Sequence, residues 1–205
     1  GYLEGVRELT LKYGTVLIFD EMITGFHFAI GGAQEYFGVT PDLACFGKGL
    51  GNGMPISAIV GKKDIMKMMD DIFFSGTFGG EALSLAAGIA VIQKMIKEPV
   101  IQHLWNFGKK VYEDIFLMIK ELKLENQIKF LGYDPWKIMM FSDHMTASSD
   151  AIKTFFQKEM IANGVLILST HNISFAMKEK EREILINAYT HTLEKLSHCL
   201  NKGNL

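Results

Sequence analysis

Residues 42–55 read DLACFGKGLGNGMP, where an apolar run ends at a glycine-rich turn that contains Lys48. Gly47 and Gly49 flank this lysine directly, and glycines let backbone and ligand approach closely because they carry no side chain. Lysines are mostly exposed in folded proteins, so Lys48 is either an ordinary loop residue or a lysine that takes part in chemistry. The remainder of the sequence has to decide between these two interpretations.

Strand-like and helix-like segments alternate along the first part of the chain. Residues 15–19 form a continuous apolar run that ends at Asp20, which is typical of a parallel strand covered on both faces. The segment 81–97 is apolar on most sides and rich in small residues, which predicts a buried helix. Further strands are expected at residues 43–46 and 56–60, and further helices at residues 2–13, 62–69 and 100–122.

After the helix predicted to end at residue 122, the pattern changes near residues 132–135 to that of a smaller α/β unit. We place the domain boundary between residues 124 and 135, which gives a first domain of residues 1–124 and a second of residues 125–205. In the second domain, strands are expected at residues 137–141 and 165–168 with a short extended piece at 174–177, and helices at residues 148–163 and 179–200.

Composition is that of an ordinary soluble globular protein: 48% of residues are hydrophobic, 21% are charged, and the formal net charge is -2. Arg7 and Arg182 are the only arginines and no long basic run occurs, so a nucleic-acid partner is not expected. No apolar stretch approaches the ~20 residues of a membrane span. Cys45 and Cys199 indicate neither a disulfide framework nor a metal site, which favours a reducing, cytoplasmic setting.

Two further places in the sequence favour a bound anion or cation. Asp20 ends a buried apolar strand, so its carboxylate either caps a turn or faces a cationic group. Residues 75–80 read SGTFGG before the helix predicted from residue 81. Glycines and hydroxyl residues before a helix suit phosphate oxygens, because free N–H groups and the helix dipole favour an anion; the alternative is a plain N-cap with a flexible lead-in.

Pyridoxal 5'-phosphate needs all three groups together: a lysine amine, an acidic partner for its ring nitrogen, and a phosphate cradle. The order of FDEMITGF at residues 19–26, GGAQ at 31–34, FGVTPDL at 37–43 and GKG at 47–49 strongly resembles the class III aminotransferases. Within that family the sequence is most similar to the glutamate-1-semialdehyde 2,1-aminomutase branch.

The resemblance implies a role for five residues. Lys48 would form the Schiff base (the internal aldimine) and then shuttle the proton between substrate Cα and cofactor C4'. Asp20 would pair with the pyridine nitrogen, and Met22 would pack on the ring face. Gly76 and Thr77 would reach the cofactor phosphate of the partner subunit, which implies a homodimer with shared active sites.

The resemblance also implies an α/β fold: that of PLP-dependent transferases of fold type I, with a mostly parallel seven-stranded sheet in the large domain and a small C-terminal α/β domain. The implied function is PLP-dependent transfer of an amino group between a small-molecule amine donor and a carbonyl compound. Intramolecular transfer, as in glutamate-1-semialdehyde 2,1-aminomutase, is the alternative activity. Substrate identity is not predicted by the sequence.

Such enzymes are about twice as long as this chain, so we expect it to be the C-terminal half of one. An inactive fragment or assembly piece is therefore a further alternative. A phosphosugar- or nucleotide-binding domain without PLP would predict a glycine-rich phosphate loop after the first strand, and the sequence has none. Among later residues, His171 and Asn172 either touch substrate or satisfy local groups, while Arg182 fits a solvated helix face better than a substrate clamp.

Overall fold

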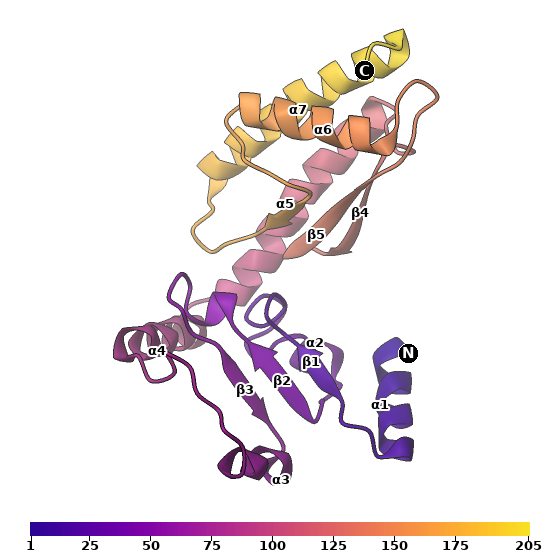
Figure 1. Cartoon of the computed structure of the whole chain (residues 1–205). Coiled ribbons are helices and arrows are strands. Elements are labelled where there is room, and N and C mark those ends of the chain that lie inside the picture. The colour runs from indigo at the N-terminus through magenta and orange to yellow at the C-terminus, as the bar shows by residue number, and fades with distance from the viewer. The chain divides into compact units, whose positions relative to one another are not determined.

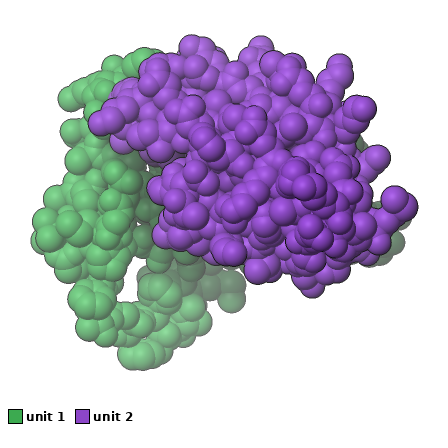
Figure 2. Space-filling view, turned by 90° about the horizontal axis from the view of Figure 1, so that it is seen from above, with its two compact units in different colours: residues 1–101 green, residues 102–205 purple.

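The computed structural model describes residues 1–205 and groups them into two units, residues 1–101 and 102–205, which Figure 2 distinguishes by colour. Each unit has its own sheet and helices. The boundary proposed from the sequence, between residues 124 and 125, concerns the large and small domains of the family and stays a prediction.

The sheet of the first unit has three strands in the order β1-β2-β3, with β1 at Ile18–Asp20, β2 at Leu43–Phe46 and β3 at Ala58–Gly61 (Figure 1). β1 pairs with β2 in parallel, and Asp20 is the register partner of Cys45. β3 runs antiparallel to β2. The carboxyl ends of β1 and β2 therefore meet at one edge of the sheet, and the chain leaves that edge directly after Asp20 and after Phe46.

The helices predicted in the first unit are present to within a few residues, and two short ones, at residues 33–37 and 48–50, were not predicted. The first helix begins and ends as predicted, because Gly14 takes a left-handed φ of 64° and its N–H bonds back to the last turn. The helix predicted at residues 62–69 is present as a short α-helix followed by a 3-10 turn. The elements are α1 (Tyr2–Tyr13), α2 (Ala33–Phe37), η1 (Lys48–Leu50), α3 (Lys63–Met66), η2 (Lys67–Asp70) and α4 (Ala82–Lys97).

A small apolar core supports the carboxyl edge of this sheet. Its buried members are Phe26, Ala44, Phe46 and Leu50, packed by partly buried neighbours that include Met95 of α4. The predicted full burial of the first strand and of the helix at 81–97 is wrong for this chain. Ile18 is 54% exposed and α4 buries only Ser84 and Gly88, because the chain's own helices cover only part of these surfaces.

Asp42 ties the opposite edge of the sheet together. Its carboxylate accepts hydrogen bonds from Arg7 of α1 at 2.8 Å and 3.1 Å, and from the backbone N–H of Leu17 at 2.8 Å. Lys62, which follows β3, approaches the same carboxylate to 2.6 Å. One buried side chain thus fixes α1, the entry to β1 and the exit from β3.

The second unit packs α5 (Val100–Glu121), α6 (Ser149–Ala162) and α7 (Glu179–Lys202) with an antiparallel sheet of order β4-β5-β6. The strands are β4 (Ile128–Tyr133), β5 (Trp136–Phe141) and β6 (Thr170–Asn172). The core side chains that are fully buried come from all three helices, and they include Val111, Tyr112, Ile115, Ile152, Phe156, Met160, Tyr189, Leu193 and Leu196.

Two sequence predictions in this unit are wrong. The apolar stretch 165–168 is not a strand: Leu166 is 85% exposed, and the strand forms at 170–172, where Thr170 and His171 pair with β5. The piece at 174–177 is not a strand either. β4 was not predicted, because the turn at Asp134 and Pro135, interpreted as a boundary marker, instead closes the β4–β5 hairpin. None of the helices is both long and apolar enough to cross a membrane.

Asp42→Asn tests the tie between α1, β1 and β3. Hydrogen bonds from Arg7 and Leu17, together with Lys62, hold the pKa of the Asp42 carboxyl well below its usual range. A lowered pKa in the folded state stabilises the protein above the unfolded value of about 4, and this contribution is lost as the pH falls below it. We expect the substitution to lower the free energy of unfolding by about 1–3 kcal/mol at pH 7 and to weaken its acid dependence, measured by urea denaturation.

Asp64→Asn is the matched control. Asp64 is 96% exposed, and its ion pair with Lys67 is long, at 4.0 Å. Its effect should stay within about 0.5 kcal/mol. Equal stability of the two variants at pH 7 would contradict the role given to Asp42.

Candidate active site

Asp20 stands at the carboxyl end of β1, at the edge shared with β2. Its Oδ1 accepts a hydrogen bond from the backbone N–H of Met22 at 3.0 Å, while Oδ2 makes no hydrogen bond within the chain. The residue is exposed. Asp20 therefore caps the turn with one oxygen, which is one of the two roles expected from the sequence. Its other oxygen is available for a cationic or N–H group.

Lys48 follows β2 at the same edge. Because Asp20 lies opposite Cys45 in the parallel register, Lys48 emerges three residues beyond that pair. Phe46 and Leu50 are buried on either side of it, while Lys48 itself is exposed. Two core side chains thus anchor a short turn whose lysine faces solvent, so the structure brings both sequence-predicted residues to one sheet edge.

Unusual backbone conformations gather at this edge. Phe26, Lys48 and Asn52 have positive φ values of 64°, 42° and 46°, and they lie in the two loops that leave β1 and β2. A bulky residue in the left-handed region is costly and persists only where its surroundings fix it; Phe26 is held by a tilted ring contact with Phe46 at 5.7 Å. Such strain is concentrated at functional sites more often than elsewhere.

Met22 lies directly against the lysine loop. A Cβ atom added to Gly47 would be 2.7 Å from both Sδ and Cε of Met22, so the thioether occupies the space that a side chain at position 47 would need. Gly47 has an extended φ of -167°, which any residue adopts. The glycine is thus required for close approach to Met22, not for its backbone conformation.

Glu21 is the residue at this edge that sequence reasoning missed. It is 1% exposed and its carboxylate accepts hydrogen bonds from Ala33 N–H at 2.7 Å and Gln34 N–H at 2.8 Å, at the start of α2. The available signal was an acidic residue directly after Asp20, followed downstream by a glycine pair and a short helix. That pattern is weak until the tertiary structure shows which helix the carboxylate meets.

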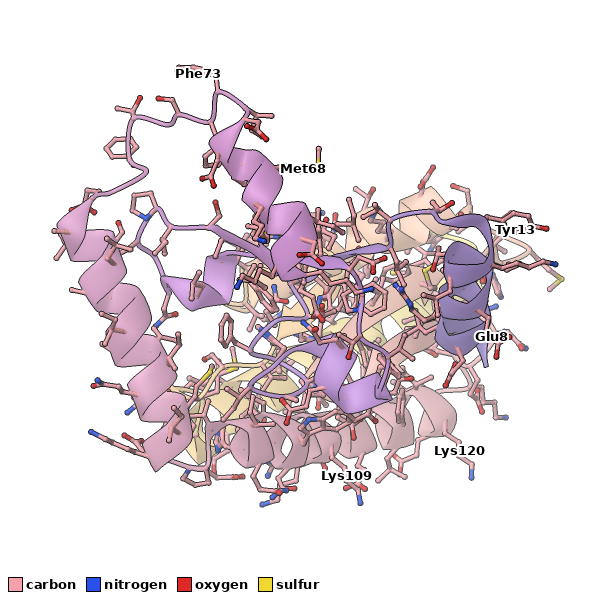
Figure 3. All side chains as sticks on the ribbon, turned by 90° about the horizontal axis from the view of Figure 1, so that it is seen from below. Glu8, Tyr13, Met68, Phe73, Lys109 and Lys120 are labelled. Atoms are coloured by element: carbon pink, nitrogen blue, oxygen red, sulfur yellow. The ribbon has the colours of Figure 1, made fainter.

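Gly76 and Thr77 lie in the segment between η2 and α4, all of whose residues from 71 to 80 are exposed. Figure 3 shows Phe73 of this segment pointing away from the rest of the first unit, and its side chain is 96% exposed. The first turn of α4 is capped by Glu81, whose carboxylate accepts from the N–H groups of Leu83 and Ser84. Two amides that could hold a phosphate are therefore already bonded.

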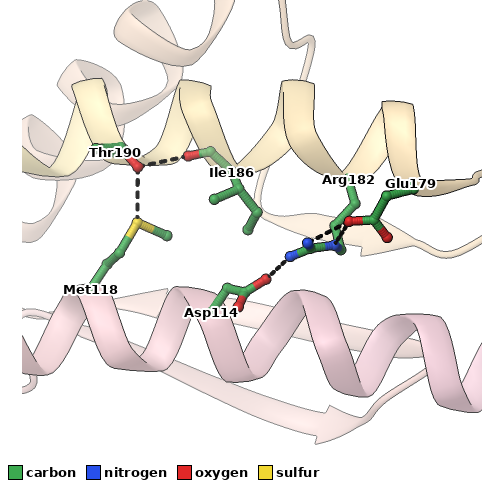
Figure 4. Close-up of polar contacts among 6 residues, drawn as sticks. All are labelled: Asp114, Met118, Glu179, Arg182, Ile186 and Thr190. Atoms are coloured by element: carbon green, nitrogen blue, oxygen red, sulfur yellow. Dashed lines mark hydrogen bonds and ion pairs between the residues drawn. The ribbon is translucent and has the colours of Figure 1, made fainter.

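The late polar candidates all lie in the second unit, where His171 and Arg182 have side-chain partners, whereas Asn172 is exposed and makes no side-chain hydrogen bond within the chain. His171 Nε2 is 2.6 Å from the hydroxyl of Tyr189, and burial lowers the pKa of His171 to about 4. Arg182 donates to Asp114 of α5 and to Glu179 of α7, which joins these two helices (Figure 4). Arg182 thus forms an interhelical ion pair, and His171 contacts a tyrosine of α7.

The architecture is that of a known class. A solved structure titled "Transaminase with PLP bound" superposes with a TM-score of 0.88 at 22% identity, over 100% of this chain and 49% of that one. An omega-transaminase from Sphaerobacter thermophilus gives 0.83 at 24% identity, over 95% of this chain and 48% of that one. The fold is that of PLP-dependent transferases of fold type I, as predicted from the sequence.

The family follows from the sequence comparison. A model described as Aminotransferase class-III matches residues 1–199, so the chain belongs to the class III aminotransferase family. Glutamate-1-semialdehyde 2,1-aminomutase of Methanosarcina acetivorans is 36% identical, over 94% of this chain and 48% of the relative. The corresponding protein of Syntrophobacter fumaroxidans is 34% identical, over 92% and 46%. The chain spans about half the length of the curated relatives it matches.

Gly47→Ala tests how Met22 sits on the lysine loop. The new methyl group would displace the flexible end of Met22, so we expect a loss of stability within about 1 kcal/mol and a clear change in the Met22 methyl resonance of ¹³C-labelled protein. Gly49→Ala is the matched control on the other side of Lys48, because its Cβ would meet only ordinary contacts at 3.8 Å. An unchanged Met22 resonance in Gly47→Ala would show that the thioether lies elsewhere.

Proposed function

We propose that this chain is part of a PLP-dependent enzyme that transfers an amino group between a small-molecule amine and a carbonyl compound. One observation carries the proposal: the parallel register of β1 and β2 brings Asp20 and Lys48 to a single sheet edge in a member of the class III aminotransferase family. Open α/β sheets bind ligands at this edge. When bound, pyridoxal phosphate supplies an aldehyde for the amine and a ring that accepts carbanion electrons.

The residues at the edge fit this cofactor. Lys48 offers an exposed primary amine on a turn that is anchored on both sides, and Oδ2 of Asp20 is available for a protonated ring nitrogen. Met22 lies over Gly47 next to the lysine and offers a polarizable apolar surface for a flat ring. An amine, a carboxylate and an apolar surface are the three kinds of group that the ring end of the cofactor needs.

We assign a distinct task to each of these residues. Lys48 would hold the cofactor through Nζ, and as a free amine it would move the proton at the substrate Cα. Asp20 keeps the ring nitrogen protonated, because a carboxylate favours a cation beside it. Met22 orients the ring by packing on one face.

The phosphate contact and the assembly belong to the same proposal. Gly76 and Thr77 stand in a wholly exposed segment, which supports a contact with another subunit and therefore a homodimer with shared sites. Cys45 and Cys199 are both unpaired, which supports a reducing, cytoplasmic setting.

Two alternatives differ in what they predict. The curated relatives at 34% and 36% identity are named aminomutases, which favours intramolecular transfer that needs no separate amine donor. The match to about half of their length favours an inactive fragment or assembly piece. A screen of amine donors and carbonyl acceptors distinguishes an aminomutase from an aminotransferase. Cofactor binding distinguishes an active enzyme from an inactive fragment or assembly piece.

Lys48→Ala tests the covalent link to the cofactor. The full-length protein purified with pyridoxal phosphate should show the visible absorption band of lysine-bound cofactor, and borohydride should fix the adduct on the peptide that contains Lys48. The variant should lose both signals, because no amine replaces Nζ. Lys63→Ala, which removes an exposed lysine of the same unit, should keep them. A fixed adduct in Lys48→Ala would sink the assignment.

Asp20→Asn tests the partner of the ring nitrogen. The amide cannot hold the nitrogen protonated, so we expect kcat to fall by about 10²–10³-fold while the visible band of the bound cofactor remains. The comparison is with Asp64→Asn, whose side chain is exposed. Unchanged turnover in Asp20→Asn would remove Asp20 from this role.

A further inference from the structure

Glu21 carries a buried carboxylate that no lysine or arginine neutralises. It is 1% exposed and takes part in none of the ion pairs of the chain. Its oxygens are instead filled by three donors: Thr24 Oγ1 at 2.5 Å, Ala33 N–H at 2.7 Å and Gln34 N–H at 2.8 Å. A buried carboxylate costs several kcal/mol unless it is hydrogen-bonded, so this arrangement holds only while all three donors stay in place.

The backbone of Glu21 is fixed as firmly as its side chain. Its N–H donates to the carbonyl of Cys45 at 2.9 Å, one step beyond the last pair of β1 and β2, and its own carbonyl accepts from Gly25 N–H at 2.9 Å. A Cβ at Gly25 would be 2.5 Å from the ring of Phe46, so this turn also lies tightly on β2. One residue thus joins β2, the turn after β1 and α2.

The loop is shaped around the Glu21 carboxylate. Gly32 has a φ of 85°, and a Cβ placed there would lie 2.7–2.8 Å from the carboxylate atoms of Glu21. Next to Gly32, Gly31 donates its N–H to the exposed Glu35 of α2 at 2.6 Å. The loop therefore has two carboxylate anchors of the same chemistry, one buried beside Asp20 and one at the surface.

The neighbours of Glu21 are the two residues proposed to hold the cofactor ring. Glu21 is the first residue after β1 and its side chain is buried, whereas Asp20 ends the strand and Met22 begins the following turn. Asp20 is exposed and Met22 is half-buried, so both are more accessible than the residue between them. Oδ1 of Asp20 is bonded to Met22 N–H, so the orientation of both side chains depends on the backbone that Glu21 fixes.

We infer that Glu21 is a positioning residue: its buried carboxylate fixes the turn that aims Asp20 and Met22 at the ligand. The inference rests on the proposed function for the roles of Asp20 and Met22, and on the hydrogen bonds of Glu21 for the way in which it holds them in place. Glu21 touches neither cofactor nor substrate and acts through its two neighbours.

Glu21→Gln is the informative substitution, because it keeps the shape of the side chain. Ala33 N–H and Gln34 N–H donate to different oxygens, and an amide offers only one acceptor oxygen, so one backbone N–H must lose its partner. We expect hydrogen exchange at the Met22 amide to accelerate about tenfold or more in cofactor-free protein, because Asp20 no longer holds it. In the loaded enzyme kcat should fall about 10- to 100-fold with little change in KM, and the pH midpoint of the visible band should shift.

Two further variants separate positioning from simple stability. Gly32→Ala pushes the Glu21 carboxylate aside without removing it, so it should produce the same changes. Glu35→Gln makes the same change at a carboxylate of the same region that accepts only one backbone N–H, which the amide oxygen can still accept, and it should leave Met22 exchange, kcat and the band midpoint as in the wild type.

The outcomes are distinct. If Glu21→Gln lowers stability but leaves Met22 exchange, kcat and the midpoint unchanged, Glu21 is a structural cap only and the inference is overturned. Equal effects from Glu35→Gln would overturn the inference as well, because a change at any carboxylate that binds the loop would then disturb Asp20 and Met22. Absence of the band in the wild type would count against the proposed function alone, since exchange at Met22 is measured without cofactor and still decides whether Glu21 controls Asp20.

Discussion

Parallel pairing of β1 with β2 is the constraint on which the candidate site depends. The register sets Asp20 against Cys45, and the bond from Glu21 N–H to the Cys45 carbonyl continues the pairing one step beyond the strands. Since parallel strands end at the same edge, Asp20 and Lys48 both emerge at that edge although they are 28 positions apart in the chain. A slip of one residue would turn Asp20 to the other face.

Two buried carboxylates hold opposite ends of this pair of strands by different means. Asp42, just before β2, is met by the cations of Arg7 and Lys62, and so joins α1 and β3 to the sheet. Glu21, just after β1, is met only by hydroxyl and backbone N–H donors. The first arrangement tolerates side-chain movement because charges act over a distance, whereas the second demands fixed geometry, which suits the end that carries the site.

Much of the fold could be predicted from local pattern, and the failures have identifiable physical causes. Two helices lie where the sequence placed them: α1, which ends at the glycine cap Gly14, and α4, which begins at the cap Glu81. The apolar stretch 165–168 looked like a strand, yet strand formation depends on a partner, and β5 pairs with residues 170–172 instead. Burial was overestimated for β1 and α4 because apolar composition indicates what a segment can bury against, not whether this chain supplies the cover.

The sequence by itself determined the family, the positions of the strands before and after Lys48, and the residue types that the proposed chemistry needs, because these are carried by short patterns in a fixed order. Only the tertiary structure decided that Arg182 is bound to Asp114, that His171 is enclosed with Tyr189, and that Glu21 underlies Asp20 and Met22. The physical reason is the same in each case: a polar side chain acquires its role from the partner that folding brings to it, and those partners lie up to 68 positions away in the chain.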